Sequence, residues 1–388
     1  MTILILARGI PSENDPQEGC FEWDQAKALK SIGINPIVMA LDARRRKGHH
    51  KWGITHLWRD EIEFYQIYGG TTTIIEHLIS YKIATIINVW LIEKLFLRVL
   101  KDHPEINLIH AHYLRCINRA SIIGKKYNIP VVGTEHWSKL VSEKLDSNVF
   151  ALGQNSYPQI DKLICVSDYL KNSIKQRFNV DSIVCGNVLS FEFINAKIAE
   201  IHKQKNDYFK FISCGSLIHR KGYDLIIKSA AKMSIPKDKW KLEIIGEGNL
   251  KKELLSLVTE YGLQENIIFR GHLNKREIVK ALNSSDTFIL GSRSETFGVV
   301  VIEALSMGVP VICTRCGGTD GLIDDSNGQY IPTDDIEAMI KAMEYAYNNQ
   351  NHYNRIMIRE NCLKKYSPKA IANQLSNIYN KVIQNTNK

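Results

Sequence analysis

Short apolar runs alternate with longer amphipathic segments along almost the whole chain. A short apolar run bounded by polar or glycine residues predicts a buried strand, and apolar residues at every third or fourth position predict a helix. Strands and helices that alternate in this way indicate an α/β fold, with parallel sheets covered by helices. In the first half we predict strands at residues 3–7, 36–41, 107–111, 130–134, 162–166 and 182–185, and helices at 22–31, 119–127 and 168–178. In the second half we predict strands at 211–214, 241–245, 267–270, 287–290, 309–313 and 329–331.

The alternation stops between residues 190 and 207, where polar residues are frequent and no strand pattern is present. This interruption predicts a domain boundary. We expect a first domain over residues 1–190 and a second over 208–366, with the final helix, 367–388, packed back onto the first. Each domain is expected to be a doubly wound, Rossmann-like sheet, and two such domains facing each other enclose a central cleft. Ligands of doubly wound sheets bind beyond the carboxyl ends of the strands.

The chain has 388 residues, of which 44% are hydrophobic and 23% charged, so it is long enough to bury two cores. Its eight cysteines are scattered, mostly within apolar runs, which is typical of reduced thiols in a core. Cys313 and Cys316 form a C-x-x-C pair, but no second pair accompanies them, so we predict no metal site. The first apolar run has no basic leader, so we interpret it as a strand and expect the protein in the cytoplasm.

The net charge of +9 suggests an acidic partner, and part of it lies in one segment. An apolar-rich helical stretch follows at residues 71–100, but charged residues interrupt it too often for a membrane span. Two interpretations stay open: core helices behind a solvated basic loop, or a surface that rests on anionic lipid at the inner face of the cell membrane. No nucleic-acid-binding motif is present, so we expect no nucleic-acid partner. The basic segment contains Arg44, Arg45, Arg46, Lys47 and Lys51, with Trp52 and Trp58 close behind.

One segment, residues 286–316, places two carboxylates where a ligand could meet them. Glu295 lies in the loop before a predicted helix, and Glu303 lies in the second turn of that helix among mostly apolar residues. An unpaired carboxylate in such a position is costly, so each should meet a polar partner. One interpretation is a buried salt bridge or a glutamate at the rim of the core. The other is that both accept hydrogen bonds from a polyhydroxylated ligand whose phosphates lie at the helix N-terminus.

A basic pair follows another strand end. Arg220 and Lys221 come after the strand at 211–214 and the glycine turn at Gly215. An arginine fork beside a lysine suits a diphosphate, whose charge must be matched when it departs as a leaving group. For an isolated pair of this kind, a solvated basic turn is the alternative.

In the first half, Gly19 lies in the loop between the first strand and the helix at 22–31, where the backbone can approach a phosphate. Two histidines follow strands, His112 in IHAHY and His136 in GTEHW. Histidines at strand ends are often structural. We prefer His136 as the residue that faces the cleft, because it follows its strand in a segment that contains glycine.

The combination of GSLIHRKG, GEG, SETFGVVVIEALSMGVPVI and TEHW resembles the retaining nucleotide-sugar glycosyltransferases of glycosyltransferase family 4, which have the two-domain GT-B architecture. The likeness covers nearly the full chain and is strongest over residues 211–321. Its most specific element is a pair of glutamates with seven residues between them, Glu295 and Glu303.

The resemblance implies that the second domain binds the nucleotide sugar and the first binds the acceptor. It also implies transfer with retention of anomeric configuration and, usually, no metal or other cofactor. The residues to which it assigns a role in catalysis or in contact with the reacting sugar and diphosphate are Glu295, His136, Arg220 and Lys221. The residues to which it assigns donor binding are Gly19, Gly215, Arg220, Lys221, Glu295, the backbone of Thr296, Phe297 and Gly298, and Glu303 for the ribose hydroxyls.

This chain departs from the family pattern at two places. Residues 186–190 read GNVLS where many members have an Asn-Gly-Val-Asp turn, and the loop at Gly19 has one glycine where many have two. We therefore predict a retaining transfer from a nucleoside diphosphate sugar, with a UDP-sugar favoured, to a hydroxyl of a glycan or lipid-linked glycan in surface polysaccharide biosynthesis. A nucleotide-sugar epimerase of the same fold and a non-catalytic nucleotide-sugar-binding partner of another transferase are the alternatives.

Overall fold

The computed structural model describes residues 1–12, 15, 18–42, 53–69, 81–197 and 207–386. Within them the chain forms two compact units, Met1–Val188 with Pro368–Lys388, and Leu189–Ser367. The basic segment at 44–52 and residues 71–80 of the apolar-rich stretch lie outside the described residues.

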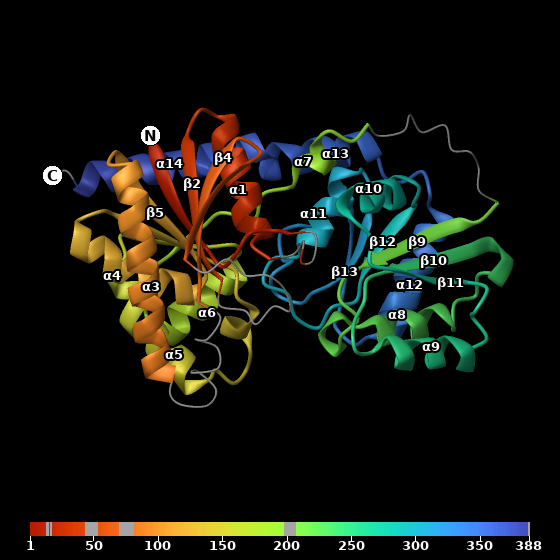
Figure 1. The fold of residues 1–388 in the computed structure, drawn as a ribbon. Coiled ribbons are helices and arrows are strands. Elements are labelled where there is room, and N and C mark those ends of the chain that lie inside the picture. Colours follow the sequence, from red (N-terminus) through yellow and green to blue (C-terminus); the bar gives the residue numbers. More distant parts are fainter. Residues whose placement is uncertain (13–14, 16–17, 43–52, 70–80, 198–206, 387–388) are drawn as a thin grey trace. The chain divides into compact units, whose positions relative to one another are not determined.

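The first unit is built on an eight-stranded sheet in the order β3-β4-β2-β1-β5-β6-β7-β8 (Figure 1). All neighbouring strands are parallel except β3 and β4, which form an antiparallel hairpin at one edge. The strands are β1 Thr2–Ala7, β2 Asn35–Asp42, β3 Ile54–Arg59, β4 Ile62–Tyr68, β5 Ile106–His112, β6 Val131–Glu135, β7 Lys162–Cys165 and β8 Ile183–Val184. The helices are α1 Cys20–Ser31, α3 Tyr81–Asp102, α4 Leu114–Tyr127, α5 Ser147–Ser156, α6 Asp168–Phe178 and α14 Pro368–Thr386.

The core of the first unit is the sheet itself. Every residue of β1 is buried, as expected for a central parallel strand with helices on both faces. The C-terminal helix α14 lies beside α1 (Figure 1), and its Tyr379 is fully buried and hydrogen-bonds His110 on β5. The last helix of the chain therefore completes the core that the first strand begins.

The second unit contains a six-stranded parallel sheet in the order β11-β10-β9-β12-β13-β14. Its buried core includes Trp240 and Phe211, with Met339 and Met343 from a covering helix. The strands are β9 Phe209–Cys214, β10 Trp240–Ile245, β11 Ile267–Gly271, β12 Thr287–Leu290, β13 Val311–Thr314 and β14 Gly328–Ile331. The helices are α7 Phe191–Ile194, α8 Tyr223–Ala230, α9 Lys251–Glu260, α10 Lys275–Asn283, α11 Val299–Ser306, α12 Ile336–Asn348 and α13 Arg355–Tyr366.

Each strand predicted from the sequence overlaps a strand of the structure, and the prediction of two doubly wound sheets is confirmed. The hairpin of β3 and β4 was not predicted from the sequence. The turn between these strands consists of Asp60 and Glu61, which both adopt positive φ. Asparagine or glycine at these positions would have indicated a hairpin turn, whereas two acidic residues do not. The hairpin adds an antiparallel edge to an otherwise parallel sheet.

The structure also bears on the cysteines, metals and membrane spans. All eight cysteines are free. Among the residues that the structure describes, no group of three histidine, cysteine, aspartate or glutamate side chains is arranged to hold a metal ion. No helix in the described part of the chain combines the length and the apolar character that crossing a bilayer requires.

Candidate functional site

The strand order of the second unit reverses at β9, which is the topological switch point of its sheet. Strand β9 lies between β10 and β12, so the chain leaves its carboxyl end toward one edge of the sheet and later returns on the other side. Loops at such a point diverge, and this is where doubly wound sheets bind ligands. The loop after β9 carries Arg220 and Lys221, and the loop after β12 carries Glu295.

The structure brings these three side chains together. The Lys221 Nζ lies 2.5 Å from Glu295 Oε1, and the Arg220 guanidinium lies 3.3 Å from Glu295 Oε2. Ser292 also donates a hydrogen bond to Glu295 Oε1 at 2.8 Å. The Glu295 side chain is 8% exposed and that of Lys221 14%, whereas that of Arg220 is 36% exposed. The arginine therefore forms the open side of the cluster.

Glu295 is held in its charged form. Its burial would raise the pKa of the carboxyl group, but Lys221, Arg220 and the Ser292 hydroxyl together outweigh burial and lower the pKa below its usual value. The cluster thus places one carboxylate between two cations. An incoming anion can bind the cations, and an incoming hydroxyl can bind the carboxylate, in place of some of these contacts.

Backbone packing explains why the two loops meet. A side chain on Gly222 would clash with the Gly291 carbonyl oxygen, so the loops touch only because both residues are glycines. The Arg293 amide donates to the Arg220 carbonyl oxygen at 2.8 Å, and its guanidinium binds both Asp224 oxygens at 3.1 and 2.9 Å. Arg293 therefore clamps the loop after β9 to the loop after β12.

A third loop fixes the backbone of Glu295. The Glu295 amide donates to the Cys316 carbonyl, and the Gly318 amide donates back to the Glu295 carbonyl at 3.0 Å. A side chain on Gly318 would overlap the backbone of Thr296, so this loop packs directly against the residues after Glu295. The position of Glu295 is set by contacts from three strand ends.

Thr296, Phe297 and Gly298 connect Glu295 to helix α11. Gly298 precedes the helix in the left-handed region with φ 89°, and its carbonyl accepts a hydrogen bond from the Val301 amide at 2.9 Å. The amides at the very start of a helix have no acceptor within it, which favours an anion there. Phe297 is buried and packs edge-on against Tyr366 at 5.7 Å between ring centroids. The Phe297 side chain is therefore part of the core.

Glu303 lies in the second turn of α11 and is half-buried. It approaches the end of β9. Burial first, and then the charge of Glu303, raise the pKa of the Cys214 thiol to about 12. Gly215 follows Cys214 directly, so Glu303, Gly215 and Lys221 surround the same strand end.

The first unit has its own switch point between β1 and β5. Arg8 follows β1, and its guanidinium lies 3.6 Å from the centroid of the Tyr113 ring, which follows β5. Arg8 also pairs with the buried Glu22 on α1 at 3.1 Å. Burial would lower the pKa of Arg8, but Glu22 outweighs it and the pKa is raised. Gly19, with φ 64°, precedes α1 here, and a side chain on it would clash with the Gly9 carbonyl.

His112 and His136 are hydrogen-bonded to each other, with 3.0 Å between Nδ1 of His112 and Nε2 of His136. His110 stacks beneath His112 at 4.5 Å, and Phe21 stacks on His136 at 5.5 Å. Burial lowers the pKa of all three histidines, that of His136 to about 3, so they are neutral at physiological pH. His112 and His136, which were alternative candidates in the sequence, are therefore hydrogen-bonded partners.

This contact gives a testable expectation. A His112→Phe substitution keeps a ring in the stack but leaves His136 Nε2 buried without its partner, so we expect a loss of about 1–3 kcal/mol of stability. His112→Asn should lose less, because its amide nitrogen can take the place of Nδ1. Thermal melting of both variants tests this. Equal melting temperatures for His112→Phe and the wild type would show that the hydrogen bond contributes nothing.

Glu135 is a further buried acid beside His136 that the sequence did not single out. Its side chain is fully buried, and Tyr157 donates a hydrogen bond to Oε1 at 2.9 Å. No described residue hydrogen-bonds its other oxygen. Burial raises the pKa of Glu135 to about 8. The position ends a buried strand, and a charged residue there is the signal by which it could have been found.

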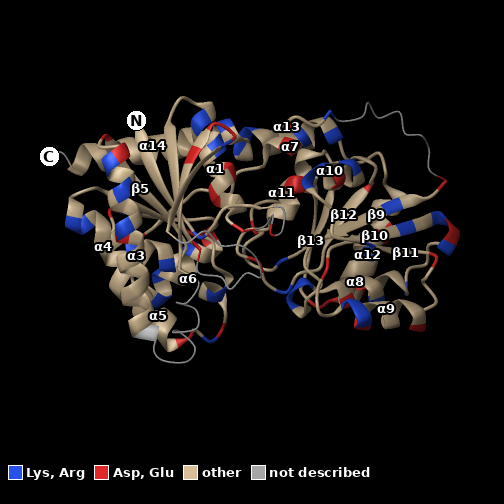
Figure 2. Cartoon of the chain, viewed as in Figure 1, with Lys and Arg blue, Asp and Glu red and all other residues tan. Residues whose placement is uncertain are grey.

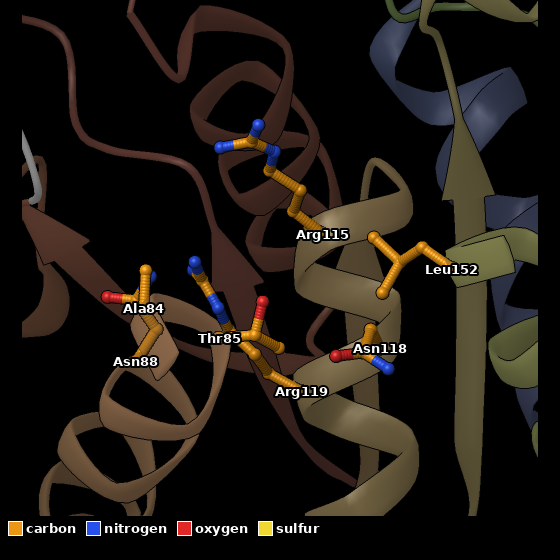
Figure 3. Close-up of a pocket in the computed structure, with 7 residues that line it drawn as sticks. All are labelled: Ala84, Thr85, Asn88, Arg115, Asn118, Arg119 and Leu152. Carbon is orange, nitrogen blue, oxygen red and sulfur yellow. The ribbon is translucent and has the colours of Figure 1, made fainter. Parts of the chain in front are cut away.

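A polar hollow lies between α3, α4 and α5 in the first unit (Figure 3). The Arg119 side chain reaches from α4 toward the residues of α3, and Arg115 turns away from them (Figure 3). This hollow was not predicted from the sequence. Its lining residues are Ala84, Thr85, Asn88, Arg115, Asn118, Arg119 and Leu152.

Comparisons with known proteins cover both units. Residues 195–361 match the family described as "Glycosyl transferases group 1", and residues 24–185 match "Glycosyltransferase Family 4". Together the two matches span most of the chain.

Two curated relatives are similar in sequence. The chain is 26% identical over 359 residues to the Bacillus subtilis protein assigned to teichuronic acid biosynthesis as the glycosyltransferase TuaC, covering 88% of each chain. It is 29% identical over 193 residues, 48% of this chain and 51% of the relative, to the N-acetylgalactosamine-N,N'-diacetylbacillosaminyl-diphospho-undecaprenol 4-alpha-N-acetylgalactosaminyltransferase of Campylobacter jejuni.

Solved structures show the fold. Sucrose-phosphate synthase from Thermosynechococcus elongatus matches with a TM-score of 0.76 at 16% identity, covering 99% of both chains. Anabaena HepE in complex with UDP-glucose matches with a TM-score of 0.67 at 17% identity, covering 98% of this chain and 100% of that one. At this identity the likeness establishes the GT-B fold and says nothing of the substrate.

Proposed function

This chain belongs to the glycosyl transferases group 1, glycosyltransferase family 4, and from that membership we propose that it is a retaining transferase that uses a nucleoside diphosphate sugar. The acceptor is a hydroxyl of a glycan or a lipid-linked glycan in surface polysaccharide biosynthesis. A UDP-sugar is the favoured donor, and binding of UDP-glucose by the structurally similar HepE supports this choice.

The observation that carries the proposal is the convergence of Glu295, Arg220 and Lys221 at the switch point of the second unit. A diphosphate leaving group gains negative charge as its bond to the anomeric carbon breaks. Two cations fixed beside that position stabilise the charge in the transition state, and they do so without reorganisation because Glu295 already orients them. This supply of positive charge from side chains fits a transfer that needs no metal ion.

The other residues of the second unit have roles that follow from their places. Glu295 and the backbone of Thr296, Phe297 and Gly298 hold the donor sugar, and the first-turn amides of α11 favour the diphosphate. Glu303 binds the ribose hydroxyls. Gly215 allows the backbone after β9 to approach the nucleotide.

We assign acceptor binding to the first unit, with Gly19 approaching the diphosphate and His136 contacting the sugar. His136 suits this role as a neutral ring, since burial keeps its pKa at about 3. A neutral imidazole can make a hydrogen bond without adding positive charge beside a reacting sugar that itself becomes positive. Protonation of this histidine is therefore not part of the proposed cycle.

Binding of UDP tests the donor site directly. UDP is expected to raise the melting temperature of the wild type, because a ligand that binds the native state stabilises it. Lys221→Met should weaken UDP binding about tenfold or more, since a hydrogen bond to a charged group contributes about 1.5–3 kcal/mol. Thermal shift against a panel of nucleoside diphosphates measures both effects.

Lys239→Met is the matched control, because Lys239 is a half-exposed lysine of the same unit that pairs with Asp238 at 3.2 Å. An equal UDP shift for Lys221→Met and wild type would contradict the donor site. Conversion of the sugar nucleotide without any acceptor would instead favour a nucleotide-sugar epimerase. Binding without turnover by the wild type would favour a non-catalytic partner.

We further propose that the acceptor is carried by a lipid and that the protein works from the cytoplasm at the inner face of the membrane. The Campylobacter jejuni relative is named for an undecaprenol-linked diphosphate acceptor, which supports a lipid carrier here.

A further inference from the structure

Helix α3 exposes large apolar side chains along one line. Ile83 is 46% exposed, Ile86 69%, Trp90 59% and Leu97 47%. They are spaced three, four and seven residues apart, so each successive side chain returns to the same side of the helix. Soluble helices usually place charged and polar residues on that side.

The helix geometry shows that this line is the outermost one. At about 3.6 residues per turn, the outer face of α3, which we define as Ile83, Ile86, Trp90, Lys94, Leu97 and Lys101, lies within an arc of roughly 80°. The opposite arc is buried against the unit, and it consists of Ala84, Asn88, Ile92, Leu95, Phe96 and Val99. The exposed apolar residues are therefore not the edge of a core, and together they form an apolar line of the kind that marks an interaction surface.

Helix α3 and the neighbouring helix α4 carry an excess of positive charge. Helix α3 carries four cations and two acids, and its neighbour α4 carries four cations and no acid, so the two helices hold six of the nine net positive charges of the chain. Figure 2 shows blue segments along both helices. The two acids are already neutralised, Glu93 by Lys126 at 2.5 Å and Asp102 by Arg98 at 2.8 Å.

On the outer face of α3, apolar residues occupy the first half of the helix and lysines occur in the second half. The apolar residues Ile83, Ile86 and Trp90 lie in its first half, and Lys94 and Lys101 flank Leu97 in its second half. Neither lysine forms an ion pair with a described residue, and the Lys94 ammonium lies 5.7 Å from the centroid of the Trp90 ring. Indole beside lysine is the combination that anchors proteins at the boundary between headgroups and acyl chains.

We propose that the outer face of α3 is the surface by which this protein docks on an anionic lipid bilayer, with the helix lying in the plane of the interface. From Ile83 to Lys101 it extends about 27 Å, at about 1.5 Å per residue. Isoleucine and tryptophan side chains enter the interface, and the lysines meet lipid phosphates. This inference rests on the proposed function for its purpose, which is to bring the first unit to a lipid-linked acceptor.

Flotation of the full-length protein with vesicles tests the surface. The wild type is expected to float with phosphatidylcholine vesicles that contain phosphatidylglycerol, and less with phosphatidylcholine alone. Ile86→Glu with Trp90→Glu should lower binding to both by about tenfold or more, because apolar contact is lost. Lys94→Glu with Lys101→Glu should lower only binding to the anionic vesicles, by more than about fivefold per residue, because each change removes an attraction and adds a repulsion. Raised salt should mimic the lost attraction.

Leu255→Glu is the matched control, because Leu255 is a 43% exposed leucine on α9 of the second unit. It should float like the wild type, and an equal loss of flotation would overturn the proposal. A wild type that stays unbound with both vesicles would overturn it too. Light scattering that shows a dimer dissociated by Trp90→Glu, without flotation, would assign the face to a second copy and overturn the lipid surface.

Separate measurements test the lipid surface and the donor site. All the substitutions are at exposed positions, so each variant should keep its melting temperature and its UDP-induced shift. A protein that shows the UDP shift but does not float contradicts the lipid surface alone. A protein that floats but binds no nucleoside diphosphate contradicts the donor site and leaves the surface standing.

Discussion

Replacing Glu295 with glutamine is expected to lower kcat/KM by about 10²–10³-fold, the cost typical of losing one fixed electrostatic contact in an active site. The amide keeps the volume of the side chain and can still accept a hydrogen bond from Ser292. It cannot hold Lys221 and Arg220 by charge, so both cations lose the group that orients them toward the leaving diphosphate. Steady-state transfer of radiolabelled sugar to acceptor, with the identified donor, measures the loss.

The control for this substitution is Glu253→Gln, an exposed glutamate on α9 of the same unit. Its activity should match the wild type. Because Glu295 is buried, melting temperatures of both variants must accompany the kinetics. A folded Glu295→Gln protein with activity within a few-fold of wild type would remove the main reason to place the sugar beside this residue.

Replacing Glu135 with glutamine is expected to change how stability depends on pH. Burial raises the pKa of Glu135 from 4.5 to about 8, so the folded protein binds this proton more tightly than the unfolded chain does. Its contribution to stability is complete below the unfolded pKa and is lost as pH rises from about 5 to 8, with a slope approaching about 1.4 kcal/mol per pH unit. Glutamine cannot ionise, so the variant should gain stability relative to wild type across that range, by several kcal/mol in total.

Urea unfolding of wild type and Glu135→Gln at several pH values between about 5 and 9 measures this difference. The three buried histidines have lowered pKa values, so they destabilise the fold when the pH falls below the pKa of an unfolded histidine. They are present in both proteins, so their effect cancels when the two stabilities are compared. Glu105→Gln, whose side chain is 55% exposed, is the control and should show no trend. A difference between Glu135→Gln and wild type that stays constant with pH would mean that Glu135 is already ionised in the folded protein.

Much of the fold could be predicted because its signals are local. A buried parallel strand is a short apolar run wherever it occurs, so twelve strands were visible in the sequence. The β3 and β4 hairpin was not, because its outer strand is exposed along most of its length and its turn is made of two charged residues. A strand that buries no face leaves no apolar pattern to read.

The candidate site divides in the same way. Glu295, Arg220 and Lys221 could be proposed because each follows a strand end, and parallel strands bring such ends to one edge of a sheet. Arg293 could not, because nothing in its neighbourhood indicates that it binds Asp224 and the backbone of Arg220. Likewise His112 and His136 were separate candidates until β5 and β6 placed them side by side.

The sequence of the apolar-rich stretch at residues 71–100 did not distinguish a core helix from a lipid-facing one. It is apolar over most positions, so its sequence supports a buried helix and a lipid-facing one equally well. Only the packed structure shows that Ile92, Leu95 and Phe96 face the sheet, while Ile86 and Trp90 point away from it.

The sequence by itself determined the order and type of most elements and the strand ends at which charged residues occur, because apolar periodicity and turn residues act over a few positions. The tertiary structure alone decided which of those residues touch. Lys221 and Glu295 are 74 residues apart, and their contact depends on the pairing of β9 with β12. It also decided which groups are buried, and so which carboxyl group is charged, Glu295, and which keeps its proton near neutral pH, Glu135. Desolvation and the distance to a counter-charge set these states, and both exist only once the chain has packed.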